Sequence, residues 1–142
     1  MTNDLADTTD GLAFVLYRSA ARDGLGKDDL QAILASARER NGQHGITGCL
    51  HHEDGLFFQW LEGPAEKIDL VMAMIRKDGR HDQLTVLDDG ALNQRRFRDW
   101  HMRFSDRNQK SLMDWLAQSD ASTVNPGEYT RGIVAFLQAL AI

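Results

Sequence analysis

The sequence has little cysteine and little proline: its 142 residues include one cysteine, Cys49, and two prolines. A single cysteine excludes an internal disulfide and leaves no thiol set for a zinc site. We therefore expect a reducing, cytoplasmic environment. The N-terminal stretch MTNDLADTTDG carries no Lys, no Arg and no apolar run. It is thus neither a signal peptide nor a membrane anchor, and we expect residues 1–11 to form a flexible tail.

Positive charge is also scarce. The chain has 16 Lys and Arg against 21 Asp and Glu, for a formal net charge of −5. A general nucleic-acid binder needs clustered cations to neutralise phosphates, so we expect no nucleic-acid partner. The remaining composition, 42% hydrophobic and 26% charged, is typical of a globular protein with one hydrophobic core.

Enzyme motifs are missing as well. The sequence has neither the G-x-G-x-x-G loop of dinucleotide-binding folds nor a phosphate-binding G-x-x-x-x-G-K-[ST] loop. His51 and His52 are adjacent on a predicted strand and point to opposite faces, so we expect an exposed or edge pair that binds no metal. Cys49 and His51 share a face, but no third group orients them, which favours a small buried cysteine. We predict that the protein is not an enzyme.

The pattern that is present predicts an α+β fold. Apolar runs, helical spacing and an Asp54-Gly55 turn indicate the order β-α-β-β-α-β-β. This is a ferredoxin-like sheet with two helices on one face. Pro64 suits the first position of the second helix. The predicted elements are strands at 12–17, 44–52, 56–63, 81–90 and 95–105, and helices at 27–41 and 64–75.

The other face of this sheet would be apolar and uncovered. Phe14, Leu16, Phe58 and Trp60 point to it by strand alternation, and a patch of that size is normally covered. Two further helical segments, 111–118 and 129–142, can supply the cover. We expect them to pack on this face or in a subunit interface.

Three polar side chains fall on otherwise apolar faces, namely Tyr17, Asn41 and Gln59. A buried amide without partners costs roughly 1–3 kcal/mol, so each must be satisfied. Each could bond separately to backbone carbonyls. Alternatively, one planar hydrogen-bonding ligand between the two helices could engage all three, with the aliphatic helix faces as its walls.

Five blocks in order give the chain its resemblance to a known family. They are LYRS (16–19), RNGQHGITGCL (40–50), GLFFQWLEGP (55–64), KDGRH (77–81) and RRFRDWHM (95–102). From residue 12 to residue 105 the chain resembles the BLUF family of blue-light sensors. The resemblance implies a flavin ring held non-covalently between the two helices. FAD is the usual ligand, with FMN or riboflavin as alternatives.

The resemblance also implies roles for particular residues. Tyr17 would be the electron and proton donor. Gln59 would be the switching amide, left either rotated or tautomerised after the photochemistry. Trp100 and Met102 would tie the ring to signalling. The implied cofactor-binding residues are Tyr17, Ile33, Arg40, Asn41, Gln59, Ile75, Asp78, Arg80 and His81.

The resulting expectation is a stand-alone photoreceptor. Residues 12–105 would form the flavin-binding domain, and residues 106–142 a helical extension that passes the signal to a separate protein. The apolar segment IVAFLQALAI favours a homo-oligomer. The alternative is a light-indifferent ferredoxin-like binding or oligomerisation module, in which the buried amides are structural.

Overall fold

The computed structural model describes residues 11–98, 102–118 and 126–140. In chain order its elements are β1 (Leu12–Ala21), α1 (Lys27–His44), β2 (Thr47–Glu53), β3 (Leu56–Pro64), α2 (Ala65–Arg76), β4 (His81–Ala91), β5 (Arg103–Asp106), α3 (Leu112–Gln118) and α4 (Pro126–Ala139). None of the helices in these ranges is long and apolar enough to span a bilayer.

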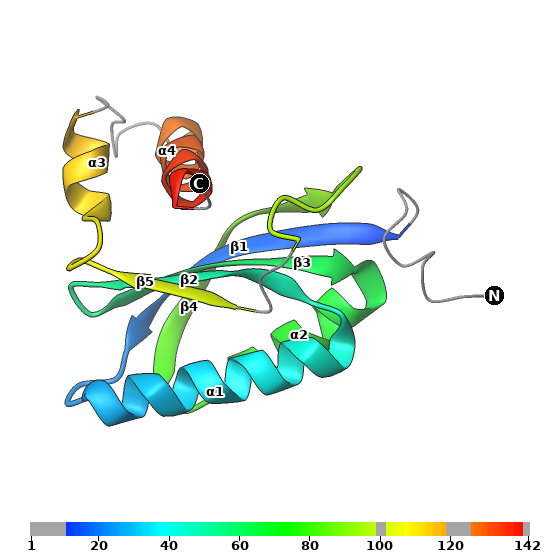
Figure 1. Cartoon of the computed structure of the whole chain (residues 1–142), viewed down its shortest axis with the longest axis horizontal. Coiled ribbons are helices and arrows are strands. Elements are labelled where there is room, and N and C mark those ends of the chain that lie inside the picture. Colours follow the sequence, from blue (N-terminus) through cyan, green and yellow to red (C-terminus); the bar gives the residue numbers. More distant parts are fainter. Residues whose placement is uncertain (1–10, 99–101, 119–125, 141–142) are drawn as a thin grey trace.

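The strands form one mixed sheet in the order β4-β1-β3-β2-β5. Strand β1 runs antiparallel to both β3 and β4, β2 runs antiparallel to β3, and β5 joins β2 in parallel. Helices α1 and α2 lie on one face of the sheet, here called the inner face, and α3 and α4 lie on the other, the outer face (Figure 1). The predicted ferredoxin-like arrangement with two C-terminal helices is confirmed.

Turn geometry fixes the β2–β3 hairpin. Asp54 and Gly55 have φ values of 52° and 79°, the left-handed pair that a tight hairpin turn requires. Helix α1 runs three residues beyond the predicted end at residue 41 and stops at Gly45, where φ is 68°. The prediction for Pro64 is wrong by one position: its ψ of 132° is extended, and α2 begins at Ala65.

Two apolar cores flank the sheet, as strand alternation predicts. The inner core joins β1–β3 to α1 and α2. The outer core joins the same strands to α3 and α4, whose Leu112, Ile133, Phe136 and Leu137 are fully buried. The C-terminal helices therefore pack on their own sheet. The apolar side chains that favoured a homo-oligomer are used within one chain, so that prediction loses this support.

The predicted strand at 95–105 is wrong in its first half. Residues 92–98 are irregular, and the described strand begins only at Arg103. The cause is Glu62, a fully buried carboxylate that accepts the backbone N–H groups of Arg96 (3.0 Å) and Phe97 (2.7 Å). Because these N–H groups bond to a side chain, they cannot join a strand ladder.

The prediction of an exposed or edge histidine pair is wrong for His51. Strand β2 lies between β3 and β5, so it is not an edge strand. His51 is fully buried, while His52 is half-buried. The described residues contain no group of three or more His, Cys, Asp or Glu that could hold a metal ion.

Candidate functional site

The inner face carries a short chain of hydrogen bonds at its centre. Tyr17 on β1 lies directly opposite Gln59 on β3, and both side chains are at most 4% exposed. The Tyr17 hydroxyl donates to Gln59 Oε1. Gln59 Nε2 donates in turn to Met102 Sδ at 3.3 Å. Tyr17 and Gln59, two of the three polar residues that stood out in the sequence, thus bond to each other, and Gln59 also bonds to a thioether.

A cavity lies beside these hydrogen bonds, between the inner face of the sheet and helices α1 and α2. It gathers eight of the predicted site residues, which are Tyr17, Ile33, Arg40, Gln59, Ile75, Asp78, Arg80 and His81. Asn41 does not line it, but is fully buried beside it and accepts a hydrogen bond from Arg40 Nε at 3.2 Å. Trp100 lies outside the described residues.

The cavity is mixed in polarity. Burial raises the pKa of Tyr17 well above its ordinary range, with Asp78 adding to the effect and Arg40 opposing it. The phenol is therefore protonated at neutral pH. At the rim, Arg80 Nη2 lies 2.7 Å from Asp78 Oδ2, and this contact lowers the pKa of the Asp78 carboxyl. The cavity is thus lined both by aliphatic side chains, such as Ile33 and Ile75, and by the charged pair Asp78–Arg80.

His81 is held by two neighbours. Its Nε2 lies 2.8 Å from the backbone oxygen of Ile75, which can only accept, so Nε2 carries a proton. Its Nδ1 lies 2.7 Å from the Ser19 hydroxyl. These contacts tie the start of β4 to the end of α2 and to β1. The imidazole is held in place as part of the wall.

Part of the cavity lining was not predicted from the sequence. Ala37, Leu50 and Phe57 also face the cavity. Their positions carried a signal: Ala37 lies one helical turn after Ile33, and Phe57 alternates with Gln59 on β3. Leu50 is the cross-strand partner of Gln59, a pairing that requires the register of the hairpin.

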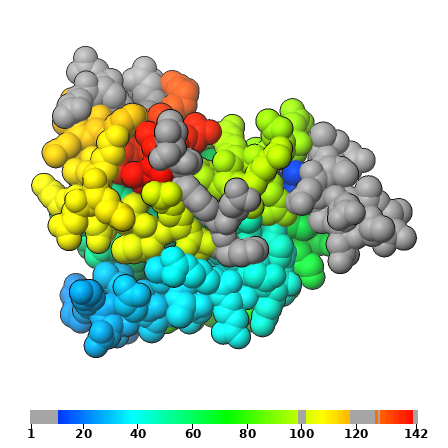
Figure 2. Space-filling model, viewed as in Figure 1, coloured from blue at the N-terminus to red at the C-terminus, as the bar shows by residue number. Residues whose placement is uncertain are grey.

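Met102 is fixed from two directions. Its thioether contacts Gln59, and its backbone oxygen accepts from Arg38 Nε on α1 at 3.1 Å. Met102 is 2% exposed and packs in the inner core. Figure 2 shows the yellow segment that includes β5 lying against the cyan helix α1 at the molecular surface. The residue before β5 is thus in direct contact with the amide beside the cavity.

Comparison with known proteins gives the family. A family model described as "BLUF: Sensors of blue-light using FAD" matches residues 12–103. The chain belongs to the BLUF family. Its β1, α1, hairpin, α2 and β4 all lie within the matched range, as does every predicted site residue.

Relatives of this BLUF chain include both short and long proteins. It is 40% identical over 89 residues to photoactivated adenylate cyclase subunit beta of Euglena gracilis, covering 63% of this chain and 10% of that one. The matched part of the chain thus spans about a tenth of the length of the first three curated relatives.

Two solved structures match over most of their length. The dark-state structure of the BLUF protein BlrB is 34% identical, with a TM-score of 0.74, over 91% of this chain and 99% of that one. The photo-activated structure of BlsA is 28% identical, with a TM-score of 0.77, over 92% of this chain and 95% of that one. Both matches include the C-terminal helices of the present fold, since they extend beyond the family model.

The residues around the cavity fit a flavin by their chemistry. Ile33 and Ile75 offer flat aliphatic walls for a tricyclic ring, and Gln59, Asn41 and Arg40 supply amide and cationic donors for ring carbonyls.

Proposed function

We propose that this protein is a blue-light photoreceptor that holds FAD non-covalently between α1 and α2. The observation that carries the proposal is the bonded series Tyr17–Gln59–Met102, whose first two members line the cavity. Hydrogen bonds join the buried phenol of Tyr17 to the carboxamide of Gln59, and that carboxamide to Met102, the residue before β5.

The proposed binding roles follow from position in the cavity. Ile33 and Ile75 would enclose the ring, and Arg40 and Asn41 would donate to its polar edge. Asp78, Arg80 and His81 would lie toward the ribityl and phosphate groups, where the Arg80 guanidinium can pair with an anion. A bound flavin supplies absorption of blue light and, once excited, a strong oxidant.

The protein residues would provide the proton path and the switch. Because burial keeps Tyr17 protonated, its hydroxyl proton points at Gln59 Oε1. A half-turn of the Gln59 amide would place Oε1 toward Met102 and remove the hydrogen bond to its sulfur. A tautomeric change would instead keep the atoms in place and exchange their donor and acceptor roles. After rotation Met102 Sδ would face the amide oxygen, and after tautomerisation it would face an Nε2 that carries one hydrogen in place of two.

The output would leave through β5. Residues 12–105 would act as the sensing unit and residues 106–142 as the segment that contacts a separate cytoplasmic protein. No catalytic activity is proposed for this chain. A homo-oligomer remains compatible with this scheme, but the apolar side chains of α4 no longer require one.

The decisive experiment is spectroscopic. The protein purified with flavin should show an absorption band that shifts to longer wavelength under blue light and recovers in the dark. Tyr17→Phe should bind flavin and show no shift. Tyr129→Phe is the matched control, because it removes the only other tyrosine hydroxyl, which contacts Arg18 on the outer face. It should shift normally.

Two outcomes would contradict the proposal. A normal shift in Tyr17→Phe would remove the phenol from the mechanism. A colourless protein that also rejects added FAD and riboflavin would instead favour the light-indifferent ferredoxin-like module, in which the Tyr17–Gln59 contact only stabilises the fold.

A further inference from the structure

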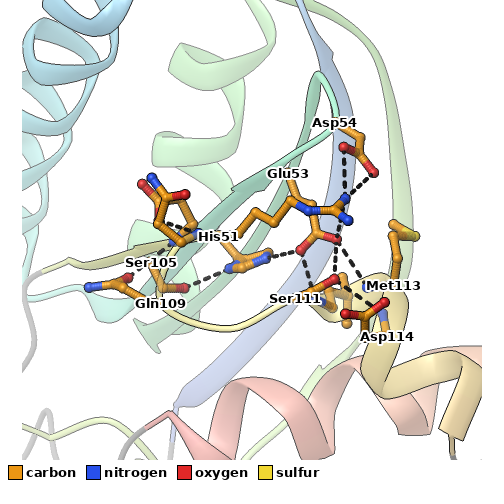
Figure 3. A network of polar contacts seen from close by, with 12 residues as sticks. His51, Glu53, Asp54, Ser105, Gln109, Ser111, Met113 and Asp114 are labelled. Carbon is orange, nitrogen blue, oxygen red and sulfur yellow. Dashed lines mark hydrogen bonds and ion pairs between the residues drawn. The ribbon is translucent and has the colours of Figure 1, made fainter.

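A second buried polar cluster lies on the outer face, and the scheme above does not use it. Its members are His51, Glu53, Ser105 and Ser111, here called the His51–Glu53 cluster. His51 and Glu53 are at most 1% exposed, and Ser105 is 4% exposed. Figure 3 shows them bridging β2, β5 and the start of α3. Burying a carboxylate and an imidazole is costly unless both are fully bonded.

The hydrogen bonds fix the protonation of His51. Glu53 Oε1 lies 2.9 Å from His51 Nε2, and an ionised carboxylate can only accept, so Nε2 carries the proton. In the neutral imidazole, Nδ1 accepts from the Ser105 hydroxyl at 2.7 Å. His51 thus joins β5 on one side to a carboxylate on the other. Burial lowers the pKa of His51, which agrees with this neutral form.

Glu53 holds the first residues of α3. It accepts from Ser111 Oγ (2.8 Å), Leu112 N (2.7 Å) and Met113 N (3.1 Å). Ser111 Oγ also accepts from Asp114 N at 3.1 Å. The start of α3 is thus anchored to β2 by one carboxylate. The ring of Phe136 on α4 meets His51 edge-on, with centroids 4.8 Å apart, so His51 and its bonded partner touch both C-terminal helices.

The same strand joins this cluster to the cavity. Ser105 pairs with His51 across the parallel β5–β2 ladder. Three residues earlier, Met102 accepts from Gln59 on the inner face. Since Met102 and Ser105 point to opposite faces, β5 carries a contact from the inner side of the sheet to the outer side.

We propose that His51 and Glu53 are positioning residues that couple β5 to the C-terminal helices. The inference rests on the proposed photoreceptor function. When the Gln59 amide changes its bond to Met102, a shift of β5 moves Ser105 away from His51 Nδ1. His51 then loses the partner that holds its ring toward Glu53, and the anchor of α3 weakens. The coupling is carried by two series of hydrogen bonds that the backbone from Met102 to Ser105 joins.

Hydrogen exchange at single amides, in the dark and under blue light, tests the coupling in the full chain loaded with flavin. Ser105→Ala removes the β5 contact and none of the atoms that bond Glu53 to α3. It should keep the flavin red shift, show faster exchange over residues 112–118 already in the dark, and lose the further light-induced change there. In the wild type, light should accelerate exchange in that segment.

Glu53→Gln tests the anchor itself. In the dark, the amides of Leu112 and Met113 should exchange on the order of tenfold faster than in the wild type, as expected for a lost helix cap. Asp54→Asn is the matched control: it neutralises the adjacent, exposed carboxylate, which contacts Arg107 Nη1 at 3.3 Å, and should change neither the exchange nor its light response.

The possible failures are distinguishable. A wild-type light response in Ser105→Ala, or a wild-type red shift with no change in α3, would overturn the coupling while leaving the photoreceptor function intact. If amide exchange at Leu112 and Met113 in the dark is the same in Glu53→Gln as in the wild type, the Glu53 carboxylate does not anchor α3. Absence of any red shift in the wild type would overturn the proposed function and the coupling that depends on it.

Discussion

At the scale of single residues, the sequence was most informative where a polar side chain occupied an apolar position. Tyr17, Asn41 and Gln59 all proved buried, and Tyr17 and Gln59 bond to one another. The identity of their partners could not be read in the same way. That Met102, and not a backbone carbonyl, receives the Gln59 amide depends on how β5 joins the sheet.

Gln59→Leu tests the amide. A leucine of similar volume fills the site but offers no donor or acceptor, so the variant should fold, bind flavin and show no light-induced red shift. The unpartnered Tyr17 hydroxyl should cost roughly 1–3 kcal/mol of stability, measured by urea unfolding. Gln31→Leu, at an exposed position of α1, should retain the shift. A full red shift in Gln59→Leu would exclude the amide as the switch.

Met102→Leu tests the thioether. The swap conserves volume and should cost less than about 1.5 kcal/mol, but it removes the sulfur that accepts from Gln59 Nε2. The red shift should form, and its dark recovery rate should differ from that of the wild type. Met74→Leu, on the exposed side of α2, should recover at the wild-type rate. If both variants recover alike, Met102 is a packing residue only.

At the scale of elements, periodicity predicted most helices and strands. It failed where backbone N–H groups bond to a buried side chain and not to a neighbouring strand. The alternation after Arg95 looked like a strand because nothing in a single sequence marks Glu62 as the acceptor for Arg96 N and Phe97 N. The same limit applies to His51, whose exposure depended on whether another strand covered β2. Both errors come from long-range pairing, which local patterns do not encode.

Glu62→Gln tests the anchor of the β4–β5 connection. The carboxylate accepts from Trp60 Nε1 and Arg96 N at Oε1, and from Thr47 Oγ1 and Phe97 N at Oε2. An amide must turn its NH2 group toward one of these donor pairs. We expect a loss of about 1–3 kcal/mol in the free energy of unfolding. Glu39→Gln, exposed on α1, should stay within about 0.5 kcal/mol of the wild type. Equal losses would contradict the anchor.

At the scale of the whole molecule, the layers were predictable and their occupants less so. An apolar outer face demanded a cover, and α3 and α4 supply it within the same chain. The sequence could not distinguish this from a subunit interface, because both bury the same side chains. Nothing in the sequence indicated that β5 pairs in parallel with β2. This pairing brings Met102, just before β5, to the inner face and Ser105 to the outer cluster.

The outer cluster should also govern acid stability. Burial alone would raise the pKa of Glu53, but hydrogen bonds from His51, Ser111 and the first amides of α3 lower it from 4.5 to about 2. A carboxyl with a lower pKa in the folded state stabilises the fold above its unfolded pKa and ceases to do so as the pH falls through the folded value. The stabilisation is therefore complete above about pH 4.5 and is lost toward pH 2, and it amounts to at most about 3 kcal/mol.

Glu53→Gln measures this contribution directly, because glutamine mimics the protonated carboxyl at every pH. The free energies of unfolding of wild type and variant should differ most at pH 7 and converge as the pH falls from about 4.5 toward 2. Asp54→Asn should track the wild type throughout, since Asp54 is exposed. Urea unfolding at pH 7, 4.5 and 3 provides the comparison. A constant difference between wild type and Glu53→Gln across this range would mean that the loss reflects altered packing and that the charge of Glu53 does not hold α3 in place.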